Sequence, residues 1–196
     1  YNETSTGILN PVWELAEAVK EHSDAIFIVD GVSGIGGVPA EMDEWGIDIL
    51  VTGSQKAMML PPGLSIVAVN EKAWKVIEAN RSNAYYLDLL SYRDWAEKGM
   101  TPNTPAVSLI MGLSAVCDLI EEEGGISKTA ERHEVMKNMV RAAMNALNIE
   151  LLTDDEYASP TITAIRTPKG LDLAEYLRHL KKKYHLDFAG GLGRLQ

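Results

Sequence analysis

Two charged residues follow apolar stretches in the first third of this chain, and each is of a type that does chemistry. Asp30 ends the apolar run 25–29, and Lys56 follows the run 48–52 within Gly53-Ser54-Gln55-Lys56. A carboxylate can hold a cationic ligand nitrogen, and a desolvated lysine amine can form a Schiff base with a carbonyl. Taken singly, an aspartate in this setting is more often a loop or helix cap, and such a lysine is more often solvated.

A third group, Glu3-Thr4-Ser5-Thr6-Gly7, supplies hydroxyls that could contact a ligand or only cap a turn. Open α/β sheets bind ligands at the carboxyl ends of their strands, where Asp30 and Lys56 are both expected. The chain between these two residues is long enough for one crossover between neighbouring parallel strands. An aspartate for a pyridinium nitrogen and a lysine for an aldehyde describe a pyridoxal phosphate site, and spacing alone goes no further.

The elements that must position these residues alternate in β/α order. Continuous apolar runs predict buried parallel strands, and apolar residues at helical spacing predict helices. We expect strands at 25–29, 48–52, 64–69, near 149–152 and 161–167, and before Gly190, and helices at 11–22, 42–45, 71–79, 85–98, 106–123, 127–147 and 172–184. The Gly124-Gly125 pair is the expected domain boundary, with β/α alternation in residues 1–123 and a small α+β unit in residues 124–196.

The composition is that of an ordinary globular chain. Of 196 residues, 46% are hydrophobic and 23% charged, and the formal net charge is −10. This charge argues against a nucleic-acid or anionic-membrane surface as the main binding partner. The single cysteine, Cys117, excludes a disulfide framework and a multi-cysteine metal site, so no metal is expected, and its helical context predicts packing in the core. The expected location is cytoplasmic.

Several motifs resemble the class V aminotransferases, and most closely their alanine–glyoxylate, serine–glyoxylate and serine–pyruvate branch. They are Glu3-Thr4-Ser5-Thr6-Gly7 with Pro11, the stretch 29–37, Gly53-Ser54-Gln55-Lys56-Ala57 with Pro61-Pro62-Gly63, Thr104-Pro105-Ala106-Val107, and Gly190-Gly191-Leu192-Gly193. The resemblance implies the α/β architecture of fold-type I, aspartate aminotransferase-like enzymes that depend on pyridoxal 5'-phosphate. Residues 1–123 would then be the C-terminal half of a large, mostly parallel-sheet domain, and 124–196 a truncated small domain.

The same resemblance implies a role for each matching residue. Lys56 would form the Schiff base with the cofactor and Asp30 would hold the pyridinium proton. Val32 would pack against the ring, Thr4 would contact the ring hydroxyl, and Gln55 would hold the phosphate. Thr104 would reach the phosphate of the other subunit's cofactor in a homodimer with shared active sites. Thr101 stands where some members have a tyrosine that contacts the same phosphate.

The reaction that the resemblance implies is transamination of a small amino acid, serine or alanine, with glyoxylate or pyruvate as amino acceptor. A lyase or desulfurase on the same scaffold and a non-catalytic truncated subunit are the alternatives. Gln55 argues against sulfur chemistry, because cysteine desulfurases place a histidine before the lysine. The chain is expected to be a piece of a longer protein, with the phosphate loop before Tyr1 and the arginine for the substrate carboxylate after Gln196.

Overall fold

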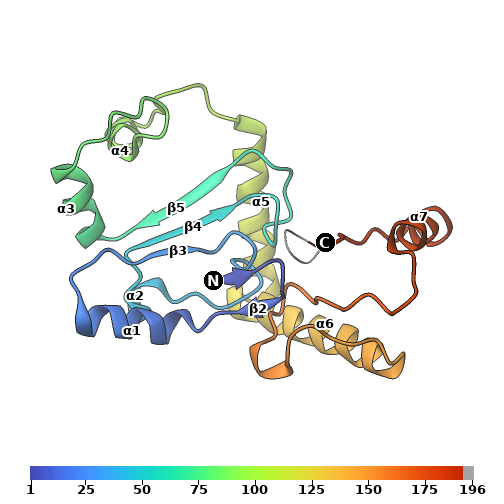
Figure 1. The fold of residues 1–196 in the computed structure, drawn as a ribbon. Coiled ribbons are helices and arrows are strands. Elements are labelled where there is room, and N and C mark those ends of the chain that lie inside the picture. Colours follow the sequence, from blue (N-terminus) through green and yellow to red (C-terminus); the bar gives the residue numbers. More distant parts are fainter. Residues whose placement is uncertain (192–196) are drawn as a thin grey trace.

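The computed structural model describes residues 1–191 and contains two small sheets with helices around them (Figure 1). In chain order the elements are β1 (Asn2–Glu3), β2 (Ile8–Leu9), α1 (Val12–His22), β3 (Ile28–Asp30), α2 (Met42–Trp45), β4 (Ile49–Gly53), β5 (Ser65–Val69), α3 (Glu71–Ala79), α4 (Leu89–Ala96), α5 (Val107–Glu123), α6 (Ile126–Ala146), the 3-10 turn η1 (Asp155–Tyr157) and α7 (Leu173–Tyr184). The expected α/β organisation is therefore confirmed.

The larger sheet has the strand order β3-β4-β5. The chain passes from β3 to β4 through α2, and the two strands are parallel, with Asp30 opposite Val51. The chain then passes from β4 to β5 through the loop 54–64, without a crossover helix, and these strands are antiparallel. A direct loop can join only antiparallel neighbours, which is why the third expected strand runs opposite to the first two.

The first strand is shorter and less buried than the apolar run 25–29 predicts. Only Ile28–Asp30 forms strand β3, and Ile28 is 60% exposed whereas Val29 is 4% exposed. Val29 faces the core, whereas no layer of the described residues covers the opposite face, on which Ile28 lies.

The strands expected in the second part of the chain are reduced to a single bridge. Leu151 and Ile165 form an isolated antiparallel bridge, with the Leu152 amide donating to the Ala164 carbonyl. Residues 185–191 are not a strand, so the expectation of a strand before Gly190 is wrong for the described residues. Leu192 and Gly193, from the last quoted motif, lie outside them.

The expected helices form, with local differences at their ends. α1 begins at Val12, and the Asn10 side chain donates to the Tyr1 carbonyl instead of capping it. α5 ends at Glu123 and is capped by Gly124, whose positive φ of 106° is suited to glycine, as the glycine pair predicts. Cys117 on α5 is exposed, so the expectation of core packing is wrong. Only Val116 of this helix is buried, because nothing among the described residues covers its outer faces.

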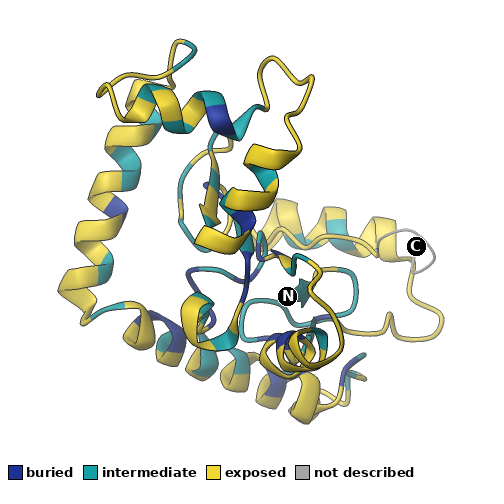
Figure 2. Ribbon diagram, turned by 90° about the vertical axis from the view of Figure 1, so that its left-hand side faces the viewer, coloured by how far each residue is buried: buried dark blue, intermediate teal, exposed yellow. Residues whose placement is uncertain are grey.

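A small core lies between the sheet and the helices α1 and α2. Val12, Val29 and Ile47 are buried there, and Tyr1 and Trp45 meet edge to face above them. Figure 2 shows that the helices are otherwise largely exposed. Contacts also cross the expected boundary at Gly124, because Ala158 bridges to Ile8 and the Ser159 amide donates to the Gly7 carbonyl. The division into two domains stays a prediction.

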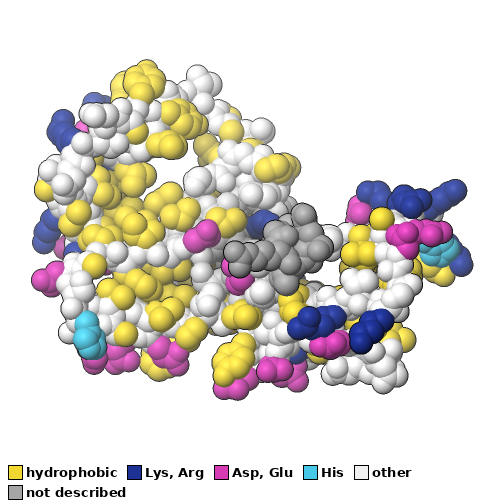
Figure 3. Space-filling view, viewed as in Figure 1, with side chains coloured by type: hydrophobic (Ala, Val, Ile, Leu, Met, Phe, Trp, Pro, Cys, Tyr) yellow, Lys and Arg dark blue, Asp and Glu magenta, His cyan; other side chains and the backbone are white. Residues whose placement is uncertain are grey.

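The surface is uneven in chemistry. Figure 3 shows apolar side chains spread over the sheet and its surroundings, and basic side chains gathered at α7, whose last turn carries Lys181, Lys182 and Lys183. α7 stands apart from the sheet at the end of an extended stretch of chain (Figure 1). Within residues 1–191, no helix is both long and apolar enough to cross a membrane.

Candidate functional site at the strand ends

Asp30 and Lys56 follow neighbouring strands at the same edge of the sheet. Asp30 is the last residue of β3, and the paired strand β4 ends at Gly53, three residues before Lys56. Because β3 and β4 are parallel, both carboxyl ends point to one edge. The sequence predicted this placement on adjacent parallel strands, and the structure has it.

The loop that follows Asp30 is tightly folded. The Asp30 Oδ1 atom accepts a hydrogen bond of 2.9 Å from the Val32 amide, and the Gly31 amide donates to the Val51 carbonyl at 2.8 Å. The amides of Gly34 and Ile35 both donate to the Gly31 carbonyl. The Asp30 carboxylate is exposed, and Oδ2 has no hydrogen-bond partner within residues 1–191.

Residues 31–37 after Asp30 form the glycine loop, and residues 54–64, which carry Lys56, form the lysine loop. The two loops are packed against each other. A Cβ atom on Gly36 would lie 3.1 Å from the Ala57 Cβ and 3.2 Å from the Ala57 carbonyl carbon. The φ of Gly36 is +99°, which also disfavours a side chain. A glycine at this point therefore lets the Asp30 loop touch the residue next to Lys56.

Ser54 fixes the lysine loop from inside. It is fully buried, its hydroxyl donates to the Pro61 carbonyl at 2.8 Å, and it accepts from the Leu64 amide at 3.2 Å. Its backbone also bonds to Leu64 and Leu60. The loop rests on α5, where a Cβ on Gly112 would lie 2.9 Å from Leu60. The apolar residues after Lys56 thus partly turn inward, although Met59 stays exposed.

Lys56 itself is exposed on this braced loop. Its carbonyl accepts from the Met59 amide, and its ammonium group has no hydrogen bond or ion pair to the part of the chain that the structure describes. An amine with no partner on a rigid support is accessible to an incoming carbonyl.

The hydroxyl cluster comes to the same loop through the β1–β2 hairpin. The Thr4 hydroxyl donates to the Ser33 Oγ at 3.0 Å. The Glu3 carboxylate accepts from the side chain and the amide of Ser5, and these bonds lower the pKa of Glu3 below its usual value. Thr4 is thus held beside the residues that follow Asp30.

Three other predicted site residues are less constrained. Val32 is half-buried in the glycine loop, and Gln55 is exposed with its side chain folded over Gly53. Thr104 is exposed on the loop before α5, and no contact given for the described residues joins it to Asp30 or Lys56. Its expected role concerns a second subunit and stays a prediction.

Sequence reasoning missed the residues that hold the site in shape. These are Asn2, Ser33, Ser54 and Thr161. Ser54 lies inside a quoted motif, but its burial leaves no trace in the pattern. Thr161 donates to the Ser33 carbonyl across 128 residues of sequence, a separation that no local pattern reports.

These side chains fit a pyridinium ring that carries an aldehyde and a hydroxyl. The free carboxylate oxygen of Asp30 suits a ring N–H, the unpartnered Lys56 amine suits the aldehyde, and the Thr4 hydroxyl suits a ring hydroxyl. Within residues 1–191 no group of three or more His, Cys, Asp or Glu side chains is arranged to hold a metal ion.

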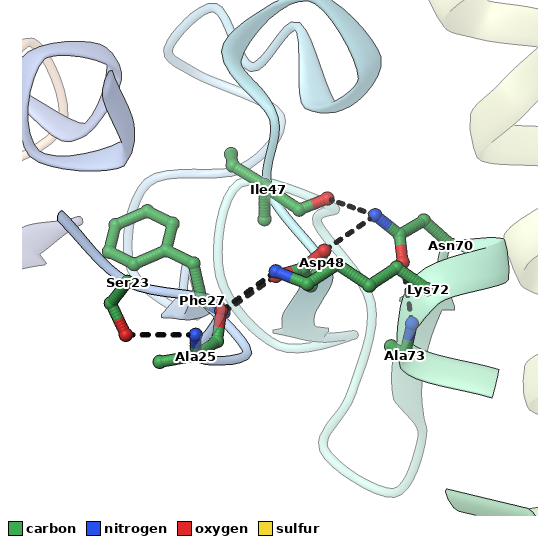
Figure 4. Close-up of polar contacts among 8 residues, drawn as sticks. All are labelled: Ser23, Ala25, Phe27, Ile47, Asp48, Asn70, Lys72 and Ala73. Atoms are coloured by element: carbon green, nitrogen blue, oxygen red, sulfur yellow. Dashed lines mark hydrogen bonds and ion pairs between the residues drawn. The ribbon is translucent and has the colours of Figure 1, made fainter. Parts of the chain in front are cut away.

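A cluster of charged and polar side chains around Asp48 lies at the opposite end of β4 and stabilises the fold. Asp48 is buried, and its carboxylate accepts from the Phe27 amide, the Asn70 side chain and the Lys72 ammonium group at 2.8–3.0 Å (Figure 4). Burial raises the pKa of Asp48, but these three hydrogen bonds and the Lys72 charge outweigh it and lower the pKa below its usual value. Lys72 also donates to the Ala25 carbonyl. The cluster joins the start of β3 to the start of α3.

The family described as aminotransferase class V matches residues 1–186. The chain is 44% identical to an uncharacterized aminotransferase of Methanocaldococcus jannaschii, over 97% of this chain and 50% of the relative. It is 41% identical to the soluble hydrogenase 42 kDa subunit of Anabaena cylindrica, over 100% and 50%. It is 35% identical to the serine–glyoxylate aminotransferase of Arabidopsis thaliana, over 100% and 49%. The chain spans about half the length of these curated relatives.

Solved structures agree in fold over the same half. The ureidoglycine–glyoxylate aminotransferase of Bacillus subtilis superposes with a TM-score of 0.92 at 32% identity, covering 99% of this chain and 50% of that one. The pyridoxamine–pyruvate aminotransferase of Mesorhizobium loti gives a TM-score of 0.93 at 33% identity, covering 100% and 50%.

Proposed function

Because this chain belongs to the class V aminotransferase family and has the fold-type I architecture, we propose that the full-length protein is a pyridoxal-phosphate-dependent aminotransferase. The observation that carries the proposal is the placement of Asp30 and Lys56 on adjacent parallel strand ends, with their two loops packed through Gly36 and Ala57.

The cofactor, when bound, would supply an electron-withdrawing ring that stabilises negative charge on a substrate carbon. Asp30 would hold a proton on the ring nitrogen through its free carboxylate oxygen, since a carboxylate stabilises a nearby positive charge. Val32 and Thr4 would orient the ring by its face and its hydroxyl, and Gln55 would contribute to the phosphate site.

Lys56 would move the proton. A neutral amine beside the substrate α-carbon can remove a proton there and return it elsewhere, which is general acid–base work. An arginine could not do this, because its guanidinium stays protonated. The braced lysine loop, with buried Ser54 beneath it, would keep the Nζ atom within reach throughout.

For the substrates, we propose serine or alanine as donor and glyoxylate or pyruvate as acceptor. Support comes from relatives named for glyoxylate and pyruvate. One relative is named L-aspartate–glyoxylate aminotransferase, so aspartate is the competing donor to include in an assay.

The test is made on the full-length protein. Borohydride reduction in the presence of pyridoxal 5'-phosphate, followed by peptide mapping, should place the reduced adduct on Lys56. An adduct on Lys72, which is occupied in the Asp48 cluster, would overturn the assignment. Turnover with serine, alanine or aspartate and each acceptor should then identify the pair. Sulfide release from cysteine, or a bound cofactor without turnover of any amino acid, would contradict the proposed reaction.

A further inference from the structure

Ser33, three residues after Asp30, is held by the second part of the chain as well as the first. Its carbonyl accepts from the Thr161 hydroxyl at 2.8 Å and from the Asn2 side-chain amide at 3.0 Å. Its own hydroxyl donates to the Asn2 carbonyl at 3.1 Å and accepts from the Thr4 hydroxyl at 3.0 Å. Ser33, which accepts the hydrogen bond from Thr4, is therefore anchored by Thr161 in the segment that follows α6.

The Thr161 hydroxyl uses its whole bonding capacity in this anchor. A hydroxyl has one proton and two acceptor positions. Its proton goes to the Ser33 carbonyl, and it accepts from Asn2 Nδ2 at 3.0 Å. The Ser159 hydroxyl, 3.1 Å away and fully buried, must then be the donor to its second acceptor position. Without the Thr161 hydroxyl, the Ser33 carbonyl would keep only the Asn2 side-chain amide as a donor.

The methyl group of Thr161 fixes the far end of the same loop. A Cβ on Gly37 would lie 2.5 Å from the Thr161 Cγ2 atom and 3.0 Å from the His133 ring. Gly37 thus sits directly against Thr161 and α6, and its neighbour Gly36 sits against Ala57 of the lysine loop. Thr161 therefore contacts both ends of the segment 33–37, which lies between Thr161 and the site.

We propose that Thr161 is a positioning residue for the cofactor site, acting through Ser33 on Thr4 and on the loop that carries Asp30. Thr161 itself does not touch the cofactor. The inference rests on the proposed function, because it assumes that Thr4 and Asp30 contact the ring.

The test compares variants of the full-length holoenzyme. Thr161→Val keeps the shape and removes the hydroxyl, and Thr161→Ser keeps the hydroxyl. Thr163→Val is the matched control, because Thr163 is half-buried two residues away and its side chain has no hydrogen bond within the described residues. Thr4→Val provides the reference effect.

Two properties are measured: the dissociation constant of pyridoxal 5'-phosphate, and the apparent pKa of the bound chromophore from a pH titration of its absorbance. Thr161→Val should weaken cofactor binding about threefold to tenfold, the effect of one lost hydrogen bond. It should also shift the chromophore pKa in the same direction as Thr4→Val. Thr161→Ser keeps the hydroxyl but loses the methyl group against Gly37, so it should restore most of both values, and Thr163→Val should change neither.

A double-variant cycle with Ser33→Ala tests the route. Ser33→Ala removes the acceptor for Thr4 but keeps the carbonyl that Thr161 anchors. If Thr161 acts through Ser33 on Thr4, the pKa shift from Thr161→Val should shrink in the Ser33→Ala background. Fully additive shifts would overturn the route.

The outcomes separate this inference from the proposed function. A parent enzyme that binds no pyridoxal 5'-phosphate would refute the proposed function. A parent that binds it, with Thr161→Val changing only the thermal stability and neither the cofactor affinity nor the chromophore pKa, would refute the positioning role alone.

Discussion

The role of Asp30 can be tested with Asp30→Asn, which removes the formal charge of the side chain and keeps its shape. Asparagine can still accept the Val32 amide through its Oδ1 atom, so the loop should keep its fold. It cannot hold a proton on a ring nitrogen, so we expect turnover of the full-length Asp30→Asn enzyme to fall by about 100-fold or more, the range found for proton-transfer groups. Stopped-flow absorbance of the half-reaction would measure this. Asp24→Asn, at an exposed position, is the control, and equal rates for both variants would contradict the role of Asp30.

The sequence predicted which residues end the strands, but not which residues hold them there. Asp30 and Lys56 stand out because each follows an apolar run, a local signal. Asn2 and Thr161 meet only in the folded chain, and Ser54 differs from a surface serine only in its burial. Such residues leave no periodic pattern, because their partners are backbone groups far away in the sequence.

At the scale of elements, the contact between the glycine loop and the lysine loop can be tested with Gly36→Ala, which adds one methyl group at that contact. Gly36→Ala and Gly46→Ala both place alanine at a positive φ, which costs about 1 kcal/mol of folding free energy each. At Gly46 nothing lies within 4 Å of the new methyl group, whereas at Gly36 it meets Ala57 at 3.1 Å. We therefore expect Gly36→Ala, but not Gly46→Ala, to weaken cofactor binding, measured by fluorescence titration. Equal affinities would show that the two loops move independently.

The Asp48 cluster makes stability depend on pH in a defined direction. The pKa of Asp48 in the folded chain is lower than the usual 3.8, so its contribution is present above about pH 4 and is lost as the pH falls below that. Urea unfolding of the apoprotein between pH 3 and pH 7 (a range of about four units) should show Asp48→Asn losing more stability at neutral pH than in acid. Asp43→Asn, at an exposed site nearby, should show no such trend. A constant difference across this range would contradict the assignment.

The elements that the sequence predicted least well are those whose neighbours are far away in the chain. The helices follow from local periodicity and caps, and they form nearly as expected. The run 64–69 identifies a strand but not its direction, which depends on the loop 54–64. The pairing near Leu151 is reduced to one bridge to Ile165, and the residues that follow, Ala158 and Ser159, pair with the β1–β2 hairpin instead.

At the scale of the whole molecule, we expect a dimer whose active sites are shared. Thr104→Val should weaken cofactor binding by about 1–3 kcal/mol, because a phosphate oxygen loses its partner. At limiting cofactor, mixing Thr104→Val with Lys56→Ala subunits should restore partial activity, since one site of the heterodimer then has neither defect. As the control, wild-type subunits are mixed with a chain carrying both substitutions, which leaves one defect in each site of the heterodimer. An active monomer in sedimentation, or no recovery on mixing, would contradict the shared site.

The hydrogen bond from Asn2 to Thr161 spans 159 residues. A ribosome adds about 5–20 residues each second, so roughly ten to thirty seconds of synthesis separate the two ends of that bond. Until Thr161 emerges, Asn2 and Ser33 lack their third partner, and the loop beside Asp30 is not yet anchored at its far end. In the lysine loop, the hydrogen bonds of Ser54 lie within residues 54–64 and the loop packs on α5, so it can close much earlier. During synthesis, the loop that supports Lys56 can therefore fold first, and the loop that follows Asp30 is fully anchored only later.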